Sequence, residues 1–190
     1  MTTIFQTLEN RGNAEEILEH GPFFCALIDE KGKKKTGIKE PWMGEGYYFW
    51  DTRIEDAHWW GRTIYDNSDY IICATEYDQH SELLFDTVGI VQHLEDFSQC
   101  AQLLKEKIKE PIITIPAVID FLKKNAEFPY QAIRMCPYPT NAKKNSFSTI
   151  KFPGNKTRFL FLDKVQICFF DKTLLTKPLS LAYPKPTHND

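Results

Sequence analysis

Hydrophobic and polar positions alternate along this chain in short blocks that have two different periods. Runs of apolar, β-branched and aromatic residues predict strands at 4–8, 70–77, 83–88, 131–135, 157–162 and 165–170. Apolar residues at helical spacing predict helices at 14–20, 54–61, 94–108 and 117–125. Because strands and helices do not alternate regularly, the pattern predicts an α+β fold with a mixed or antiparallel sheet.

Glycine, proline and small polar residues mark the expected ends of these helices. Asn13 is placed to cap the first helix and Gly21 to end it. Thr52 precedes the second helix in the same way, and Gly61 is interpreted as its end. Pro116 suits the first position of the last helix, where its missing N–H would have no partner within the helix.

The composition is that of an ordinary globular chain, with 42% hydrophobic and 26% charged residues among 190. A net charge of -3 argues against broad electrostatic binding to nucleic acid. No apolar run approaches the roughly 20 residues of a membrane span, and the N-terminus shows no secretory signal. We therefore expect a cytoplasmic protein that does not enter a membrane. The five scattered cysteines have neither zinc-ligand spacing nor a hydrolase signature, so we expect reduced thiols and no metal.

The segment 44–51, Gly-Glu-Gly-Tyr-Tyr-Phe-Trp-Asp, combines a glycine turn with the start of an aromatic strand. Gly44 and Gly46 allow a tight turn and a close approach of the backbone to a ligand. A tyrosine delivered from such a strand can form a stacking platform for a flat heterocycle. The alternative interpretation is a buried aromatic strand that follows a glycine turn.

Three motifs together resemble the ADP-ribosyltransferase fold, in the branch of diphtheria-toxin-like enzymes and poly(ADP-ribose) polymerases. The first is the strand at 4–7 with the helix end at 16–21, similar to the family's His-Gly strand and Ile-Leu-x-x-Gly helix end. The second is Gly-x-Gly-x-Tyr-Phe at 44–49, with Ala57 in the helix behind it. The third, 165–171, is similar to the strand that begins at the family's catalytic glutamate.

This resemblance implies a split mixed or antiparallel sheet core with flanking helices, and a protein that binds NAD. It implies a single domain over residues 1–180, with a helical insertion around 94–148. Residues 181–190, rich in proline and polar side chains, are expected to form a frayed tail. The activity that it implies is transfer of ADP-ribose from NAD to a macromolecular acceptor, protein or nucleic acid, as a toxin-like or regulatory function.

The resemblance assigns roles to individual residues of this chain. Tyr48 matches the tyrosine that stacks on nicotinamide, next to Gly44 and Gly46. Gln6 and Thr7 stand where the family has His-Gly, and are expected to bind the ribose and the nicotinamide of NAD. A further glutamine occupies the position of the catalytic glutamate, at residue 166.

Gln166 limits what can be expected of catalysis. Its amide keeps the shape and the hydrogen bonds of a glutamate, but it brings no negative charge to an oxocarbenium-like transition state. Asp163 lies roughly 10 Å away along a strand, and Glu76 and Asp78 are alternative acids after another strand. The sequence therefore leaves three interpretations open: a transferase, a catalytically degenerate module that binds a nucleotide or a protein, and an unrelated α+β binding protein.

Overall fold

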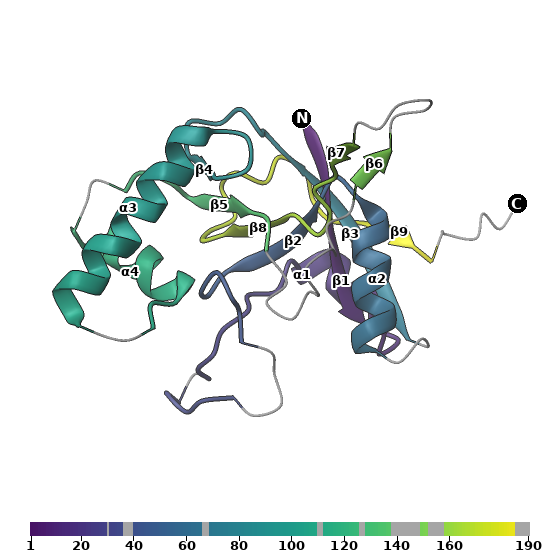
Figure 1. Cartoon of the computed structure of the whole chain (residues 1–190). Helices are drawn as coiled ribbons and strands as arrows, with labels where there is room; N and C mark the ends of the chain where they lie inside the picture. Colours follow the sequence, from purple (N-terminus) through teal and green to yellow (C-terminus); the bar gives the residue numbers. More distant parts are fainter. Residues whose placement is uncertain are drawn as a thin grey trace, which may run out of the picture.

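The computed structural model of the chain describes residues 1–29, 31–35, 40–65, 69–109, 112–125, 128–137, 149–151 and 158–184. Seven strands of this part form one sheet in the order β4-β5-β8-β2-β1-β3-β9 (Figure 1). Their bounds are β1 Thr2–Glu9, β2 Tyr47–Asp51, β3 Tyr70–Tyr77, β4 Leu84–Asp86, β5 Ala132–Met135, β8 Gln166–Phe169 and β9 Ser180–Tyr183. The remaining two, β6 Thr149–Lys151 and β7 Arg158–Leu160, pair with each other.

The seven-stranded sheet is mixed and mostly antiparallel. β4 and β5 run parallel, whereas every other pair of neighbours in it is antiparallel. The predicted α+β fold with a mixed or antiparallel sheet is therefore confirmed. The predicted strands at 4–8, 70–77 and 131–135 are present as β1, β3 and β5, and the aromatic segment forms β2.

The helices in the described residues are α1 (Ala14–His20), α2 (Ile54–Ile64), α3 (Val91–Ile108) and α4 (Ile115–Asn125). The register places Phe5 opposite Trp50, and Trp50 opposite Gln166, so these side chains share one face of the sheet. We call it the Tyr48 face, because Tyr48 lies two residues from Trp50 on the same strand. On this face α2 covers one end of the sheet, and α3 with α4 cover the other (Figure 1).

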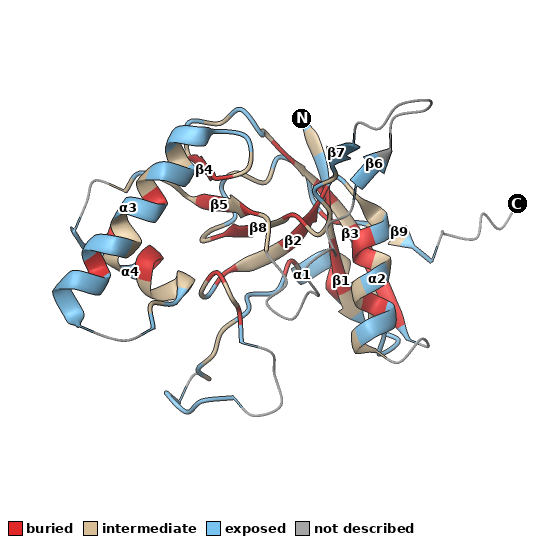
Figure 2. Ribbon diagram, viewed as in Figure 1, coloured by how far each residue is buried: buried red, intermediate tan, exposed pale blue. Residues whose placement is uncertain are grey.

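Buried residues lie on the strands and on the inward sides of the helices (Figure 2). On the Tyr48 face Ala57 of α2 packs with Trp50, while α3 and α4 enclose Ile133 of β5. α1 packs on the opposite face through Ile17, beside Phe49. The sheet is thus covered on both faces, and β2 and β8 lie between the two groups of helices on the Tyr48 face.

Gly61 does not end the second helix, as the sequence suggested, because α2 continues to Ile64. The glycine instead allows close packing: a Cβ at this position would lie 2.5 Å from the Tyr70 ring. Thr52 is not the cap either, since Arg53 occupies that position and Thr52 adopts a positive φ of 52°. Asn13 does precede α1, but its side chain makes no capping hydrogen bond.

The C-terminal tail is ordered further than the sequence suggested. Residues 181–183 belong to β9, which pairs with β3 at the edge of the sheet, and residues 185–190 lie outside the described part. The segment 94–148, for which a helical insertion was predicted, carries most of α3 and all of α4. It also contains β5, which is an inner strand of the main sheet.

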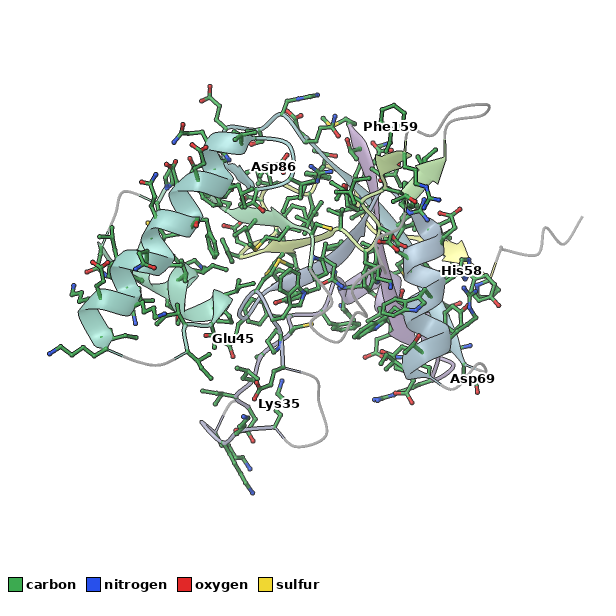
Figure 3. All side chains as sticks on the ribbon, in the orientation of Figure 1. Lys35, Glu45, His58, Asp69, Asp86 and Phe159 are labelled. Atoms are coloured by element: carbon green, nitrogen blue, oxygen red, sulfur yellow. The ribbon has the colours of Figure 1, made fainter. Side chains whose placement is uncertain are left out.

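A buried ionic network joins three strands at the end of β2. Arg134 of β5 donates to Asp51 of β2 through Nε and Nη2, at 2.9 and 2.7 Å. Its Nη1 donates to both carboxylate oxygens of Asp86, which ends β4, at 3.1 and 3.0 Å. Figure 3 shows Asp86 at the end of the sheet that lies beside α3. The network holds the end of the strand that carries Tyr48.

Candidate functional site

The three motifs of the sequence lie on adjacent strands, in the order β8-β2-β1. Tyr48 is opposite Cys168, and Trp50 is opposite Gln166. Tyr48 and Gln166 are therefore diagonal neighbours on the same face, with Cβ atoms about 7 Å apart. Both side chains are half-buried. The fold thus brings together two candidate residues that are 118 positions apart in the sequence.

The Tyr48 hydroxyl is tied to the glycine turn that precedes its strand. It donates to the carbonyl oxygen of Gly44 at 2.7 Å and accepts from the Met43 N–H at 2.9 Å. Burial raises the pKa of this phenol well above its ordinary value. The hydroxyl therefore has a structural role and remains protonated, so it is the ring that would meet a ligand.

The two glycines of the turn are needed for different reasons. Gly44 adopts a positive φ of 89°, a conformation that L side chains rarely adopt. Gly46 pairs with Cys25 through two backbone hydrogen bonds, of 2.8 and 3.2 Å. A Cβ on Gly46 would overlap the Cys168 sulfur and the Phe169 carbonyl oxygen. The backbone of Gly46 therefore lies close against other parts of the protein and is not available to a ligand, whereas Gly44 lies at the surface of the turn.

Gln166 is held by a tryptophan that the sequence analysis did not single out. The indole Nε1 of Trp42 donates to Gln166 Oε1 at 2.5 Å. This bond fixes the orientation of the amide, so that Nε2 is the group left to donate. Trp42 lies just before the glycine turn, 124 residues from Gln166 in the sequence. No local pattern indicates such a pair, and only the pairing of β2 with β8 brings it together.

Gln6 and Thr7 of the first motif point to opposite faces of β1. Thr7 shares the Tyr48 face with Phe5, and its hydroxyl donates to the Ala57 carbonyl oxygen at 2.9 Å. Gln6 is buried and points to the other face, where its Nε2 donates to the Tyr48 carbonyl oxygen at 3.2 Å. Gln6 Oε1 is buried without a hydrogen-bond partner. An acceptor is therefore left unused next to the backbone of the Tyr48 strand.

The alternative acids are occupied by other contacts. Glu76 of β3 forms an ion pair of 2.7 Å with Lys177. Asp78 accepts the backbone N–H of His80 at 2.9 Å in the turn after β3. Neither residue belongs to the strands that carry Tyr48 and Gln166. The carboxylate nearest to Tyr48 along β2, Asp51, is engaged by Arg134.

The aromatic residues of α2 serve mainly to pack the sheet. Trp50, Trp59 and Trp60 form a cluster with ring centroids 5.8 to 6.2 Å apart. His58 lies on the side of α2 that faces β3 and β9 (Figure 3), where its Nδ1 is 2.9 Å from the Tyr70 hydroxyl and its ring contacts the Tyr183 ring. Partial burial lowers the pKa of His58. It contacts β3 and β9, whereas Tyr48 lies on β2, with β1 between β2 and β3.

Within the part of the chain that the structure describes, no three His, Cys, Asp or Glu residues gather as a metal site would require. None of the helices in the same part has the length and apolar character needed to cross a bilayer. Comparisons of this chain with protein-family models, with curated proteins and with solved structures gave no match.

Proposed function

We propose that this chain is an ADP-ribosyltransferase-like protein that binds NAD on the Tyr48 face and transfers its ADP-ribose to a macromolecular acceptor. The observation that carries this proposal is the pairing of β2 with β8. It places Tyr48, from the Gly-x-Gly-x-Tyr-Phe motif, beside the residue that stands at the glutamate position. Gln6, from the first motif, contacts the Tyr48 backbone from the next strand, β1.

The side chains available at this site suit the parts of NAD that the proposal assigns to them. The half-buried Tyr48 ring would support the nicotinamide by stacking. The oriented Nε2 of Gln166 would donate to a ribose hydroxyl and hold the sugar for cleavage of its bond to nicotinamide. Gln6 points to the opposite face of β1, so it would support the site only indirectly, through the bond from its Nε2 to the Tyr48 carbonyl oxygen.

One observation favours a second candidate function, a catalytically degenerate module that binds NAD without transferring ADP-ribose. Gln166 is neutral, and its oxygen already accepts the Trp42 N–H. Positive charge that develops on the ribose would therefore meet an amide dipole where a carboxylate would stabilise it directly. The acids Glu76 and Asp51, bound by Lys177 and Arg134, do not replace it.

Calorimetry with NAD, together with labelling of a cell lysate by adenylate-radiolabelled NAD, tests the two candidates. Tyr48→Ala should weaken NAD binding about tenfold, because it removes the stacking ring. Tyr48→Phe should retain binding, since it keeps the ring and removes only the hydroxyl that holds the turn. Tyr47→Ala is the matched control: this ring points to the opposite face and packs on Phe24, at 5.1 Å between centroids.

The outcomes separate the candidates. Label transfer by the natural protein that is lost in Tyr48→Ala supports the transferase. Binding without transfer, together with NAD cleavage gained in Gln166→Glu, supports the degenerate module. If NAD produces neither heat nor label, or if Tyr47→Ala abolishes binding as fully as Tyr48→Ala, the NAD proposal is wrong.

A further inference from the structure

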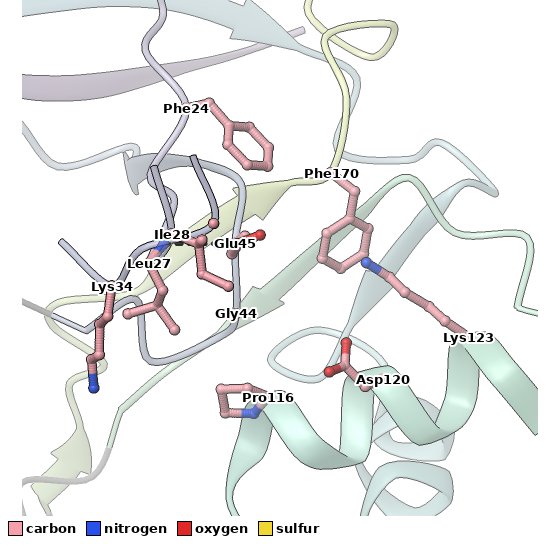
Figure 4. A pocket seen from close by; sticks show the side chains of 11 residues that line it. Phe24, Leu27, Ile28, Lys34, Gly44, Glu45, Pro116, Asp120, Lys123 and Phe170 are labelled. Atoms are coloured by element: carbon pink, nitrogen blue, oxygen red, sulfur yellow. Dashed lines mark hydrogen bonds between the residues drawn. The ribbon is translucent and has the colours of Figure 1, made fainter. Parts of the chain in front are cut away.

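A cavity of about 600 Å³ lies behind the glycine turn, between this turn, the segments 24–28 and 32–34, and α4 (Figure 4). Its volume is within the range of small-molecule sites. The walls are mostly apolar, and an aromatic ring lies on each side, from Phe24 and from Phe170. Leu27, Ile28 and Pro116 complete the apolar lining. Tyr48 and Gln166 do not line this cavity, although α4, which covers part of the Tyr48 face, forms one of its walls.

Two opposite charges of α4, Asp120 and Lys123, lie at the mouth of this cavity. They are three residues apart, a spacing at which opposite charges on a helix can pair. They do not pair here: the Lys123 ammonium lies over the Phe170 ring, 3.3 Å from its centroid. Among the described residues, Asp120 forms neither an ion pair nor a hydrogen bond. Figure 4 shows both side chains directed at the same space.

The other charged residues of the lining already have partners. Glu45 accepts the backbone N–H of Leu27 at 2.8 Å, which connects two walls of the cavity. Lys34 pairs with Glu40 at 2.6 Å, and it points away from the centre of the cavity (Figure 4). The groups that face the cavity without an ion-pair partner are therefore the Asp120 carboxylate and the Lys123 ammonium, which lies over the Phe170 ring, together with the apolar surface between the two phenylalanine rings.

We propose that this cavity binds a small zwitterion with an apolar side chain, of the chemical class of the aromatic and aliphatic α-amino acids. The ligand ammonium would pair with Asp120 and the ligand carboxylate with Lys123. The apolar side chain would lie against Phe24 and Phe170, where burial of its surface contributes most of the affinity. Because both charges are exposed, each pair contributes modestly, and binding in the millimolar range is expected.

This site does not depend on the proposed NAD function, but the two are mechanically connected. Gly44 lines the cavity, and its carbonyl oxygen accepts the Tyr48 hydroxyl from the other side. A ligand in the cavity therefore touches the turn that holds the Tyr48 ring. The backbone amide of Gly44 should report occupancy of the cavity directly.

A titration followed by the ¹H–¹⁵N resonances of Gly44 and Gly32 tests the proposal with three probes. L-Phenylalanine carries both charges, phenethylamine only the ammonium and 3-phenylpropionate only the carboxylate. L-Phenylalanine should shift these resonances saturably below about 10 mM, and each single-charge probe should bind about fivefold more weakly. No saturable shift with L-phenylalanine, or equal affinity for all three probes, would overturn the proposal.

Charge-removing variants assign the two ends of the ligand. Asp120→Asn should weaken the binding of L-phenylalanine and of phenethylamine about fivefold and leave the binding of 3-phenylpropionate unchanged. Lys123→Met should weaken the binding of L-phenylalanine and of 3-phenylpropionate about fivefold and leave the binding of phenethylamine unchanged. Lys124→Met, next along α4 and outside the cavity lining, is the matched control. All three positions are exposed, so we expect folded variants, which circular dichroism verifies. The proposal is wrong if Asp120→Asn and Lys123→Met bind L-phenylalanine as tightly as Lys124→Met does.

Discussion

Replacement of Arg134 by methionine should lower the free energy of unfolding by about 3–5 kcal/mol. The guanidinium is the cation of a network in which the side chains of Asp51 and Asp86 are only 3% and 11% exposed. Methionine keeps the length and much of the volume of the arginine stem. The variant therefore mainly removes the charge and the four hydrogen bonds, and leaves two carboxylates buried without a cation.

The magnitude follows from burial and geometry. An exposed ion pair contributes about 0–1 kcal/mol because water screens both charges. Removal of one partner from a buried pair costs several times more, since the remaining charge is desolvated without compensation. The chain contains a matched exposed pair in Lys177 and Glu76, at 2.7 Å, in which the lysine side chain is 60% exposed. Lys177→Met should therefore lose no more than about 1 kcal/mol.

Urea unfolding followed by tryptophan fluorescence measures both losses, because Trp50 is buried in the folded protein. Arg134→Lys should fall between the natural protein and Arg134→Met, since a lysine keeps the charge but cannot bond both carboxylates with the planar fork of an arginine. The reasoning is refuted if Arg134→Met is no less stable than Lys177→Met. That result would mean that water reaches the two carboxylates.

Three further predictions concern packing and titration. Gly61→Ala should lose about 1–3 kcal/mol of unfolding free energy in urea, because its Cβ would lie 2.5 Å from the Tyr70 ring; unchanged stability would show that the ring moves aside. Cys73 and Cys168 should resist alkylation by iodoacetamide at about pH 8 until urea is added, because burial raises the pKa of these thiols to about 11 and about 12. Mass spectrometry measures the labelling, and rapid labelling of the folded protein would contradict the prediction. Burial lowers the pKa of His58, so the unfolded chain binds a proton at this histidine more readily than the folded protein does. The free energy of unfolding should therefore fall as the pH drops below 6.5, the ordinary pKa of the side chain. His58→Gln should flatten this part of the plot of stability against pH, and an unchanged plot would contradict the prediction.

Most strands could be predicted from the sequence because their signal is local, whereas β9 falls largely in a stretch whose prolines and polar residues suggested a frayed tail. β3 is a run of β-branched and aromatic residues, and nearly all of its side chains are buried, so composition alone indicates it. Gly61 shows the limit of such a signal. Its spacing was that of a helix end, but the contact that requires a glycine is with Tyr70, on the following strand. Whether a glycine ends a helix or permits close packing depends on a tertiary contact.

The candidate site could be predicted only in part, for the same reason. Tyr48 and its glycine turn form a contiguous motif, and the structure places the tyrosine on a half-buried face. Trp42 and Arg134 carry no comparable motif. Their partners, Gln166 and Asp51, lie 124 and 83 residues away, so the pairs arise from strand order and not from local pattern. Adjacent residues of a strand face opposite sides, but the sequence alone could not show which of Gln6 and Thr7 shares the face of Tyr48, because this depends on the register of β1 with β2.

The glycine turn contributes to two surfaces of the molecule, the Tyr48 face and the wall of the cavity. The Tyr48 hydroxyl holds Met43 and Gly44 in place, so the position of the ring and the shape of the turn change together. Gly44 in turn forms part of the cavity wall, opposite α4. Tightly packed contacts transmit displacement, since there is little free volume to absorb it. A ligand that moves Gly44 must therefore move the Tyr48 ring or break its hydroxyl contacts. The turn would thus couple occupancy of the cavity to the geometry of the Tyr48 face, where we propose that NAD binds.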